Sequence, residues 1–438
     1  MTMEPVIKKT KLEDPSGRLR CQYVIVKKDR QCGMTRRADE QYCSEHLNLL
    51  KKNSGSLIHS GVTSTETGGR ERIPCPLDPN HTIWKDQLTR HMKKCNKFKM
   101  SHANDNEPYY QKDMNSLVET VELSEVIDYK QFLDQTIHIL QKWDDTSDIP
   151  LKQESNQEMV EKRVNTLTNQ KHAIQQSSLI QNMISAKILN TSSSNQDYIE
   201  FGCGKAEFSR YLNQVICLTK DHVPHEITYH LIDRASNRMK FDSKFAADTQ
   251  DLTKQLQMTP NIKRIKIDIK DLKLDTQLDS SHGYVAISKH LCGVATDLTL
   301  RCIMNNNLLH QQLDGLCIAM CCRHVCSHKD YINPSYIKSL LPNDITYEQF
   351  FTCLTKVCSW ATNGRRQGMV GTDTVEITES ISMTLEEREA LGLAARKIID
   401  LGRLKWVQQN LGKDARLVRY VDKSISLENV ALLLNTSD

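Results

Sequence analysis

The stretch Tyr198-Ile-Glu-Phe-Gly-Cys-Gly-Lys-Ala-Glu-Phe-Ser209 decides the fold of this 438-residue chain. An apolar run ends in an acid, turns on two glycines and continues into a helical segment. This is how a strand passes into a helix in a nucleotide-binding sheet. Gly202 and Gly204 allow the backbone to approach a ligand closely, because neither carries a Cβ. We expect Glu200, at the end of the strand, to meet the polar head of that ligand.

Three further segments repeat the pattern of a short strand that ends in polar residues. They are Thr228–Asp233, Arg264–Asp268 and Tyr284–His290. Because ligands bind at the carboxyl ends of the strands in an open parallel sheet, we expect Asp233 to hold a ribose diol and Asp268 to hold an adenine amino group. Asp271 is the alternative to Asp268. The alternation of strands and helices predicts an α/β domain with a Rossmann-like, S-adenosyl-L-methionine (SAM)-dependent methyltransferase fold over residues 171–438; a generic α/β core is the alternative.

The rest of the carboxyl-terminal half continues this alternation. A fifth strand is expected after Gly315, and a long amphipathic helix from Leu385 to Gln409. Gly392 and Gly402 lie within that helix and predict a kink or a break. Two final strands complete a set of seven, at residues 415–421 and 427–434.

The loop after the fourth strand is where a transferred methyl group would meet its acceptor. We expect the strand to end at Ser288 and a helix to begin near Val294, with Lys289, His290 and Cys292 between them. A lysine or histidine could orient or deprotonate a ribose hydroxyl, and desolvation of the lysine would suit such a role. The cysteine could instead add to a pyrimidine ring. A lysine that only caps the helix or pairs with an acid is a further alternative.

Two other groups of polar residues lie near this predicted edge. A thiol-rich segment contains Cys321, Cys322, His324 and Cys326. Their crowding makes a four-ligand tetrahedral metal site awkward, so we expect this segment to line the acceptor pocket, with inert buried thiols as the alternative. A helical segment before the sheet carries three residues that either line the cleft or form a surface face: His172, Gln175 and Gln176.

The composition narrows the class of protein. Net charge is only +4, but basic residues outnumber acids from Lys8 to Arg37 and from Lys85 to Lys99. Such segments favour a polyanion such as nucleic acid, with ordinary solvated surface as the alternative. No apolar run approaches the ~20 residues that span a bilayer, and the amino terminus lacks the apolar core of a secretion signal. We therefore expect an intracellular protein without a membrane partner, whose 15 cysteines are metal ligands or thiols.

The first of two small metal modules occupies residues 18–50. Its candidate ligands are Cys21, Cys32, Cys43 and His46. Zinc accepts three thiolates and one imidazole in a tetrahedral site, and a segment this short and polar needs a metal to fold. We expect a structural zinc ion here; four unconnected residues in a loose tail are the alternative.

The second module occupies residues 73–100 and follows a flexible linker at residues 51–72, which is rich in Ser, Thr and Gly. Its candidate ligands are Cys75, His81, His91 and Cys95. The last two are four residues apart and so share one helix face, whereas the first two are expected in a proline-rich turn. We expect a second structural zinc ion, with an incidental basic helix as the alternative. A helical and polar connector is then expected over residues 101–170.

In combination these motifs resemble the eukaryotic tRNA 2′-O-methyltransferases that modify the fourth nucleotide of the acceptor stem. The module from Cys21 to His46 resembles the CCCH finger of that family, and the module from Cys75 to Cys95 resembles its CHHC finger. Four segments resemble its methyltransferase domain: residues 199–204, 231–234, 288–293 and Cys321-Cys322. The resemblance covers nearly the whole chain. It implies SAM as methyl donor, the ribose 2′-hydroxyl as acceptor and tRNA as partner.

Two features qualify the resemblance. Ala206 stands where a third glycine is common, and the Lys-Asp-Lys-Glu tetrad of other ribose methyltransferases is not evident. The catalytic roles of Lys289 and His290 are therefore inferred from their position. Our hypothesis is a tRNA methyltransferase with two structural zinc ions and no evident protein partner, in the cytoplasm or the nucleus. The alternatives are an RNA-binding zinc-finger scaffold with a degenerate core, and a SAM methyltransferase that acts on an RNA base or a protein.

Overall fold

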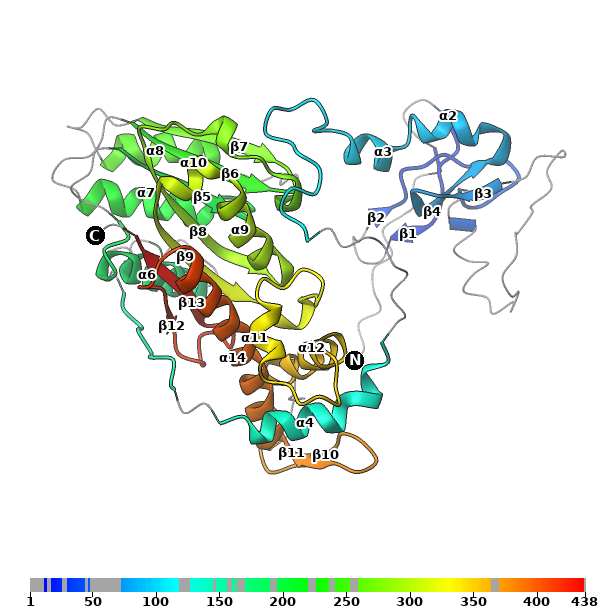
Figure 1. Cartoon of the computed structure of the whole chain (residues 1–438). Coiled ribbons are helices and arrows are strands. Elements are labelled where there is room, and N and C mark those ends of the chain that lie inside the picture. Colours follow the sequence, from blue (N-terminus) through cyan, green and yellow to red (C-terminus); the bar gives the residue numbers. More distant parts are fainter. Residues whose placement is uncertain are drawn as a thin grey trace, which may run out of the picture. The chain divides into compact units, whose positions relative to one another are not determined.

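The computed structural model divides the chain into two compact units, Met1–Asp105 and Asn106–Asp438 (Figure 1). The structure describes residues 12–13, 17–25, 30–43, 46–47, 72–117, 127–144, 147–155, 160–161, 163, 170–189, 195–219, 226–235, 241–252, 259–363 and 370–436. Apart from its last residue, the predicted linker at 51–72 lies outside this set. Among the described residues, no helix is long and apolar enough to cross a membrane.

A short β-hairpin frames the first metal module. Its strands, β1 (Val24–Ile25) and β2 (Arg30–Gln31), pair in antiparallel orientation. The three cysteines predicted as ligands are buried together, and Tyr23 and Tyr42 pack against them. Because this cluster is small, a bound metal would supply much of the stability of the module.

The second metal module is a hairpin followed by short helices. Its elements are β3 (Arg72–Cys75), β4 (Asp78–Trp84), η2 (Lys85–Gln87), α2 (Leu88–Met92) and α3 (Asn96–Ser101). The expectation that Cys75 and His81 lie in a turn is wrong, because Cys75 ends β3 and His81 lies inside β4. The prolines are tolerated since a two-stranded sheet has only edge strands, where a missing N–H costs no ladder bond.

The second unit is a mixed α/β structure built on one large sheet. Its strands are β5 (Gln196–Phe201), β6 (Glu226–Asp233), β7 (Thr259–Lys266), β8 (Gly283–Cys292), β9 (Leu313–Cys321), β12 (Arg416–Arg419) and β13 (Val430–Asn435). They follow the order β12-β13-β9-β8-β5-β6-β7, which confirms the predicted count of seven. The five strands from β9 to β7 are parallel, whereas β13 is antiparallel to both of its neighbours. The carboxyl ends of the parallel strands therefore meet at one edge.

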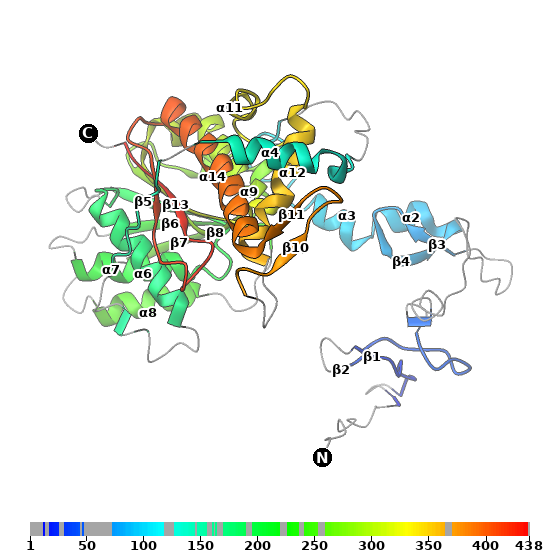
Figure 2. The same ribbon diagram turned by 90° about the horizontal axis from the view of Figure 1, so that it is seen from below.

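Helices cover both faces of the sheet (Figure 2). One face is packed by α6 (Gln170–Ser185), α7 (Glu207–Thr219) and α8 (Asp242–Leu252), and the other by α9 (Val294–Asn305), α10 (Asn307–Gln311) and α14 (Leu385–Asn410). Since both faces of the sheet are covered, side chains on both faces of the central strands are buried, rather than only alternate ones. Every residue of β5 is buried, for example.

A third apolar cluster lies beside the sheet and includes part of the predicted connector. It joins α4 (Leu133–Lys142), α11 (Pro334–Lys338), α12 (Tyr347–Cys358) and α14, with α13 (Trp360–Asn363), η3 (Tyr129–Phe132) and the hairpin of β10 (Thr374–Glu376) and β11 (Ser382–Thr384) around them. Ile137 of α4 is fully buried there. Closer to the sheet, the Asn115 amide donates to the carbonyls of Ile269 and Leu272 at 2.7 and 2.9 Å. The described residues from 106 to 155 thus belong to the second unit.

The helix α14 is continuous, so the predicted break at its two glycines does not occur. A Cβ at Gly392 would lie 2.4 Å from the backbone nitrogen of Ala361, and a Cβ at Gly402 would lie 1.9 Å from the Tyr331 hydroxyl. Both glycines therefore serve close packing of neighbouring segments against an unbroken helix.

The strand β8 runs four residues further than predicted. Its pairing with β9 is interrupted between Ser288 and Leu291 and resumes with Leu291 opposite Met320 and Cys292 opposite Cys321. Lys289 and His290 therefore lie in a β-bulge rather than in a loop. Bulges re-aim side chains at the ends of strands, and this one positions the two predicted catalytic residues.

Candidate active site and metal centres

The glycine turn after β5 has the backbone conformation that the sequence predicted. Gly202 and Gly204 have φ angles of +66° and +52°, which favour residues without a Cβ. A Cβ at Gly202 would lie 3.0 Å from the His290 carbonyl oxygen, whereas a Cβ at Gly204 would meet no atom within 4 Å. The turn therefore lies against the β8 bulge on one side and faces open space on the other.

Ala206, at the position of the common third glycine, also has a left-handed backbone with a φ of +64°. It is fully buried, and its N–H donates to the Cys203 carbonyl at 2.6 Å. An alanine in this conformation costs free energy that a glycine would not. The surrounding packing therefore holds Ala206 in a backbone conformation that is locally unfavourable.

Asp233, at the carboxyl end of β6, fastens the turn to the neighbouring strand. Its carboxylate accepts the backbone N–H groups of Gly204 and Ala235, both at 2.7 Å. Arg264 holds the same turn from β7 by donating to the Gly204 carbonyl at 2.9 Å, and it forms an ion pair with Asp242. Arg264 was not predicted as a site residue, because β7 also carries Asn261, Lys263 and Lys266, and nothing in this pattern distinguishes one of its basic residues.

Glu200 lies beneath the turn rather than on its open side. It is 3% exposed and accepts hydrogen bonds from the Ser209 N–H at 3.1 Å and from the Ser209 hydroxyl at 2.5 Å. Burial raises the pKa of Glu200 to about 7, despite these hydrogen bonds. In this arrangement it links the end of β5 to the first turn of α7.

The two acids considered after β7 have different surroundings. Asp268 is half-buried and caps η4 (Ile269–Asp271) by accepting the Lys270 N–H at 3.2 Å. Asp271 forms an ion pair with Lys270 at 2.8 Å and accepts the Asp113 N–H at 2.7 Å. Since Asp271 helps to hold the segment around residue 113, Asp268 is the better candidate for a ligand contact.

Lys289 is the central polar residue of the bulge. It is only 5% exposed, and its Nζ lies 2.7 Å from Nδ1 of His172 and 3.3 Å from Nε2 of His290. Burial lowers the pKa of Lys289 to about 8. Burial, followed by repulsion from Lys289, also lowers the pKa of His172. Neutral imidazoles can accept hydrogen bonds from the amine, so the three residues form a compatible cluster.

The polar residues predicted on α6 are His172, Gln175 and Gln176, and the two glutamines are buried near this cluster. Gln175 and Gln176 are 8% and 1% exposed, so they do not form a surface face. Gln176 donates to Glu207 at 3.2 Å and accepts from Arg163 at 2.5 Å. Of the three residues singled out on this helix, His172 is the one that contacts Lys289.

The thiol-rich segment after β9 does not bring its four suspected ligands together. The sulfur atoms that converge are those of Cys292, Cys321 and Cys322. The Cys326 sulfur instead accepts a hydrogen bond from Arg403 at 3.3 Å. The convergence of Cys292 with the other two was not predicted, because it depends on the pairing of β8 with β9.

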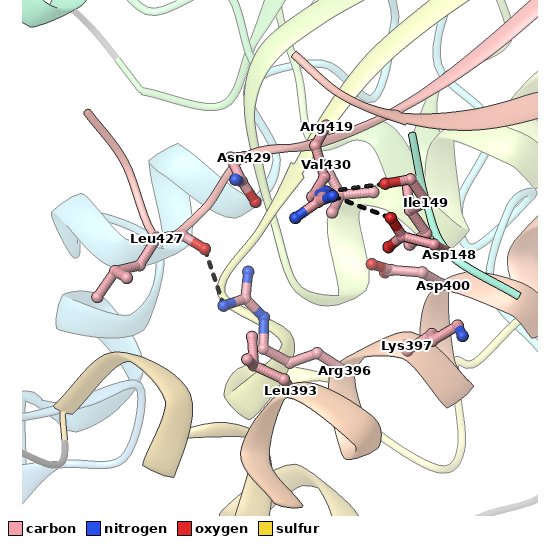
Figure 3. A pocket seen from close by; sticks show the side chains of 10 residues that line it. All are labelled: Asp148, Ile149, Leu393, Arg396, Lys397, Asp400, Arg419, Leu427, Asn429 and Val430. Atoms are coloured by element: carbon pink, nitrogen blue, oxygen red, sulfur yellow. Dashed lines mark hydrogen bonds and ion pairs between the residues drawn. The ribbon is translucent and has the colours of Figure 1, made fainter. Parts of the chain in front are cut away.

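A separate pocket lies between α14, the end of β12 and the start of β13 (Figure 3). Its lining includes five charged residues that bind neighbouring groups: Asp148, Arg396, Lys397, Asp400 and Arg419. Arg396 donates to the Leu427 carbonyl at 2.9 Å, and Arg419 donates to the Ile149 carbonyl at 2.8 Å. None of the predicted site residues lines this pocket. Its residue Arg419 holds the chain at residues 148–149 against the end of β12.

The first finger presents ligand atoms at distances that suit zinc. Nδ1 of His46 lies 3.5 Å from the sulfur of Cys21 and 3.2 Å from that of Cys43. A tetrahedron with zinc bonds of ~2.3 Å to sulfur and ~2.0 Å to nitrogen separates these atom types by about 3.6 Å. The ligand atoms of all four residues lie within 4.8 Å of one another. The donor set therefore fits one zinc ion.

The second finger fits the same test. The two sulfurs, of Cys75 and Cys95, are 3.9 Å apart, and the Nε2 atoms of His81 and His91 are 3.1 Å apart. Ideal zinc geometry gives about 3.8 and 3.3 Å for these pairs. Cys95 follows α2 with its N–H bonded to the His91 carbonyl, so helical spacing brings these two ligands to one side, as predicted.

Comparison with known proteins identifies the class of this protein: it is a methyltransferase that carries two zinc-finger segments. The family described as "Methyltransferase TRM13" matches residues 174–435. The "CCCH zinc finger in TRM13 protein" matches residues 19–47, and the "U11-48K-like CHHC zinc finger" matches residues 72–96. The matched segments contain all eight predicted metal ligands and, apart from His172, all the residues of the candidate site named above.

The chain belongs to the TRM13 methyltransferase family. It is 47% identical to the "tRNA:m(4)X modification enzyme TRM13" of Saccharomyces cerevisiae, with 98% of each chain covered. It is 44% identical to the protein of the same name from Vanderwaltozyma polyspora, with 96% of this chain and 98% of the relative covered. The Schizosaccharomyces pombe protein of that name is 36% identical over 83% of this chain and 95% of its own length.

Proposed function

We propose that this protein transfers the methyl group of SAM to the ribose 2′-hydroxyl of the fourth nucleotide in the tRNA acceptor stem. The observation that carries the proposal is the buried Lys289 amine, 2.7 Å from His172 Nδ1, in a bulge that contacts the glycine turn. The relatives described above are named as tRNA:m(4)X modification enzymes, which supports tRNA as the substrate and its fourth position as the target.

The proposed SAM site is the carboxyl edge of a Rossmann-like sheet. Gly202 and Gly204 form the close-approach turn, and the open space beyond Gly204 suits a ligand that would exclude a Cβ. Asp233 ends β6 and Asp268 follows β7, where the ribose and the adenine amino group would be bound. Glu200, buried beneath the turn and bonded to Ser209, would support the turn from below at the methionine end of the ligand. The strand order and the acids at successive strand ends support this assignment.

The proposed chemistry needs a base rather than another positive charge. SAM, when bound, supplies an electrophilic methyl group and leaves as a neutral thioether. Neutral Lys289 accepts the proton of the 2′-hydroxyl as its oxygen forms the new bond to carbon. The depressed pKa of about 8 makes a useful neutral fraction available near pH 7. His172 is a positioning residue that accepts a hydrogen bond from the amine, and His290 borders the same amine at the more exposed side.

The zinc fingers are proposed to hold one structural zinc ion each and to contact the tRNA backbone. Six basic side chains of the second finger are exposed: Lys85, Arg90, Lys93, Lys94, Lys97 and Lys99. Neutralising several phosphates makes affinity fall steeply as salt rises. A-form RNA presents its 2′-hydroxyls in a wide, shallow minor groove, so an acceptor stem can be bound without unpairing. We further propose that the protein acts in the cytoplasm, the nucleus or both.

The test uses two tRNA transcripts that differ in a single oxygen. The full-length protein is incubated with methyl-labelled SAM and with tRNA carrying either a ribose or a 2′-deoxyribose at the fourth nucleotide. The proposal expects label on the first and none on the second. Equal labelling of both would establish a base or another ribose as the acceptor. SAM binding without any labelling of tRNA would favour a protein acceptor, and the absence of SAM binding would favour the RNA-binding scaffold.

A further inference from the structure

Three cysteines outside the fingers bring their sulfur atoms together at the carboxyl edge of the sheet. Cys292 ends β8, Cys321 ends β9, and Cys322 follows directly. The sulfur atoms of Cys292 and Cys321 are 3.4 Å apart, and all three lie within 4.8 Å of one another. The in-register pairing of Cys292 with Cys321 places both side chains on the same face of the sheet.

Simple apolar packing does not account for this cluster. Cys292 is exposed, unlike Cys302 and Cys317, which are fully buried in the core and are separate from any group of metal-binding residues. Cys322 has a left-handed backbone with a φ of +52°, a conformation that is costly for a side chain of this kind and is often retained at functional sites. The backbone is thus held in a strained form that turns a third thiol toward the other two.

The donor set is the one that thiophilic ions prefer. Thiolates select zinc among the common divalent ions, and tetrahedral Zn–S bonds of ~2.3 Å separate sulfur atoms by about 3.8 Å. The cluster needs only small adjustments to reach this spacing. Three protein ligands leave a fourth position, which the exposure of Cys292 makes accessible to water.

The surrounding charges are compatible with a bound ion and three thiolates. A neighbouring carboxylate, Glu428, accepts the Cys322 N–H at 3.2 Å and forms ion pairs with Arg323 and Arg396. Arg323 also pairs with Asp400, so the two arginines and the two carboxylates are neutral together and add no net negative charge beside zinc with three thiolates. The same contact fixes the backbone of Cys322, as partners outside the ligand shell commonly do at metal sites.

We propose that Cys292, Cys321 and Cys322 bind a third zinc ion, separate from those of the fingers. This ion cross-links the ends of β8 and β9 immediately beyond the bulge that carries Lys289 and His290. Its role is structural: it prevents the two strand ends from separating and so maintains the position of the bulge. The proposal of this zinc site does not depend on the proposed function, because it is argued from the arrangement of the three thiols.

The first test counts zinc ions in the full-length protein, purified under reducing conditions, with the elemental content measured against protein concentration. The triple variant C292S/C321S/C322S is expected to contain one zinc ion fewer than the unaltered protein. With both fingers occupied, the counts are three and two. The matched control is Cys326→Ser, which alters a nearby thiol that is bound by Arg403 rather than included in the cluster. It should retain the full count.

A second measurement guards against a triple variant that does not fold. Cobalt replaces zinc in the unaltered protein and in Cys292→Ser, which changes only an exposed residue at a strand end. The thiolate-to-cobalt absorption should decrease in Cys292→Ser and stay unchanged in Cys326→Ser. Equal zinc contents and equal cobalt spectra in all the variants would overturn the proposal. So would a Cys292–Cys321 disulfide in the reduced, purified protein, because it would make the cluster a redox pair instead.

Discussion

The Nζ atom of Lys289 lies 2.7 Å from Nδ1 of His172, although the two residues are 117 positions apart in the chain. One comes from the bulge of β8 and the other from α6, which precedes the first strand of the sheet. The contact makes burial of an amine tolerable, because the imidazole accepts one of its hydrogen bonds. It also fixes the amine beside the glycine turn, where the proposed methyl transfer occurs.

The first prediction concerns the pH dependence of methyl transfer. If neutral Lys289 is the base, the single-turnover rate rises about tenfold per pH unit below its pKa of about 8 and levels off above it, because the protonated amine cannot accept a proton. Lys289→Arg keeps the charge but does not deprotonate. It should lower the rate by ~10²-fold or more, the usual contribution of a general base. SAM affinity, measured by calorimetry, should change little, and a Lys289→Arg enzyme with full activity would contradict the assignment.

The second prediction concerns Asp233. The variant Asp233→Ala removes the acceptor of the Gly204 and Ala235 N–H groups, so the turn loses its anchor to β6. We expect SAM affinity to fall at least tenfold and stability to fall by about 1–3 kcal/mol. Asp279→Ala is the matched control, because Asp279 also accepts a backbone N–H two residues on, but at an exposed turn that precedes β8. It should leave SAM binding unchanged.

The third prediction uses the raised pKa of Glu200. Its folded pKa of about 7 lies above the ordinary value of 4.5, so between these limits the folded chain holds a proton that the unfolded chain has lost. The contribution of Glu200 to the free energy of unfolding is therefore fully present below pH 4.5. It is lost as the pH rises from 4.5 through 7. The loss is of the order of 3 kcal/mol. Denaturant unfolding of Glu200→Gln should lack this contribution; identical pH profiles for both proteins would exclude it.

The fourth prediction tests the close packing of α14. In Gly402→Ala the new Cβ would lie 1.9 Å from the Tyr331 hydroxyl, so the tyrosine or the helix must shift. Overpacking of this kind costs about 1–3 kcal/mol and should lower the thermal midpoint. The same substitution in a Tyr331→Phe background should cost less, because the clashing oxygen is absent. Additive effects of the two changes would show that the contact is not responsible.

The fifth prediction separates the two units of the chain. Cys95→Ser removes one thiolate from the CHHC finger and should weaken tRNA binding at least tenfold, since the basic residues around it depend on that fold. SAM affinity should not change, because the methyltransferase unit has its own core. The matched control is His102→Ala, a histidine of the same unit outside the ligand set. It should retain tRNA binding, as filter-binding titrations at two salt concentrations would reveal.

Local spacing was enough to predict both metal modules and the count of seven strands in the large sheet. The ligands of each finger lie close together in the sequence, so the chain between them restricts their geometry. The predicted parallel strands were recognised as short runs followed by polar residues. Such runs are mostly apolar because both faces of the sheet are buried. By contrast, Gly392 and Gly402 predicted a break in α14, because helix propensity does not report the neighbours that need the space.

The sequence by itself determined the features that depend on residues close together in the chain. These are the turn at Gly202 and Gly204, the finger ligands and the acids at strand ends. Only the tertiary structure decided which distant groups meet. It extended β8 into a bulge, brought His172 to Lys289, and gathered Cys292 with Cys321 and Cys322. The physical reason is that hydrophobic periodicity indicates which face of an element is buried, whereas the register between strands and the packing of helices decide what lies against that face.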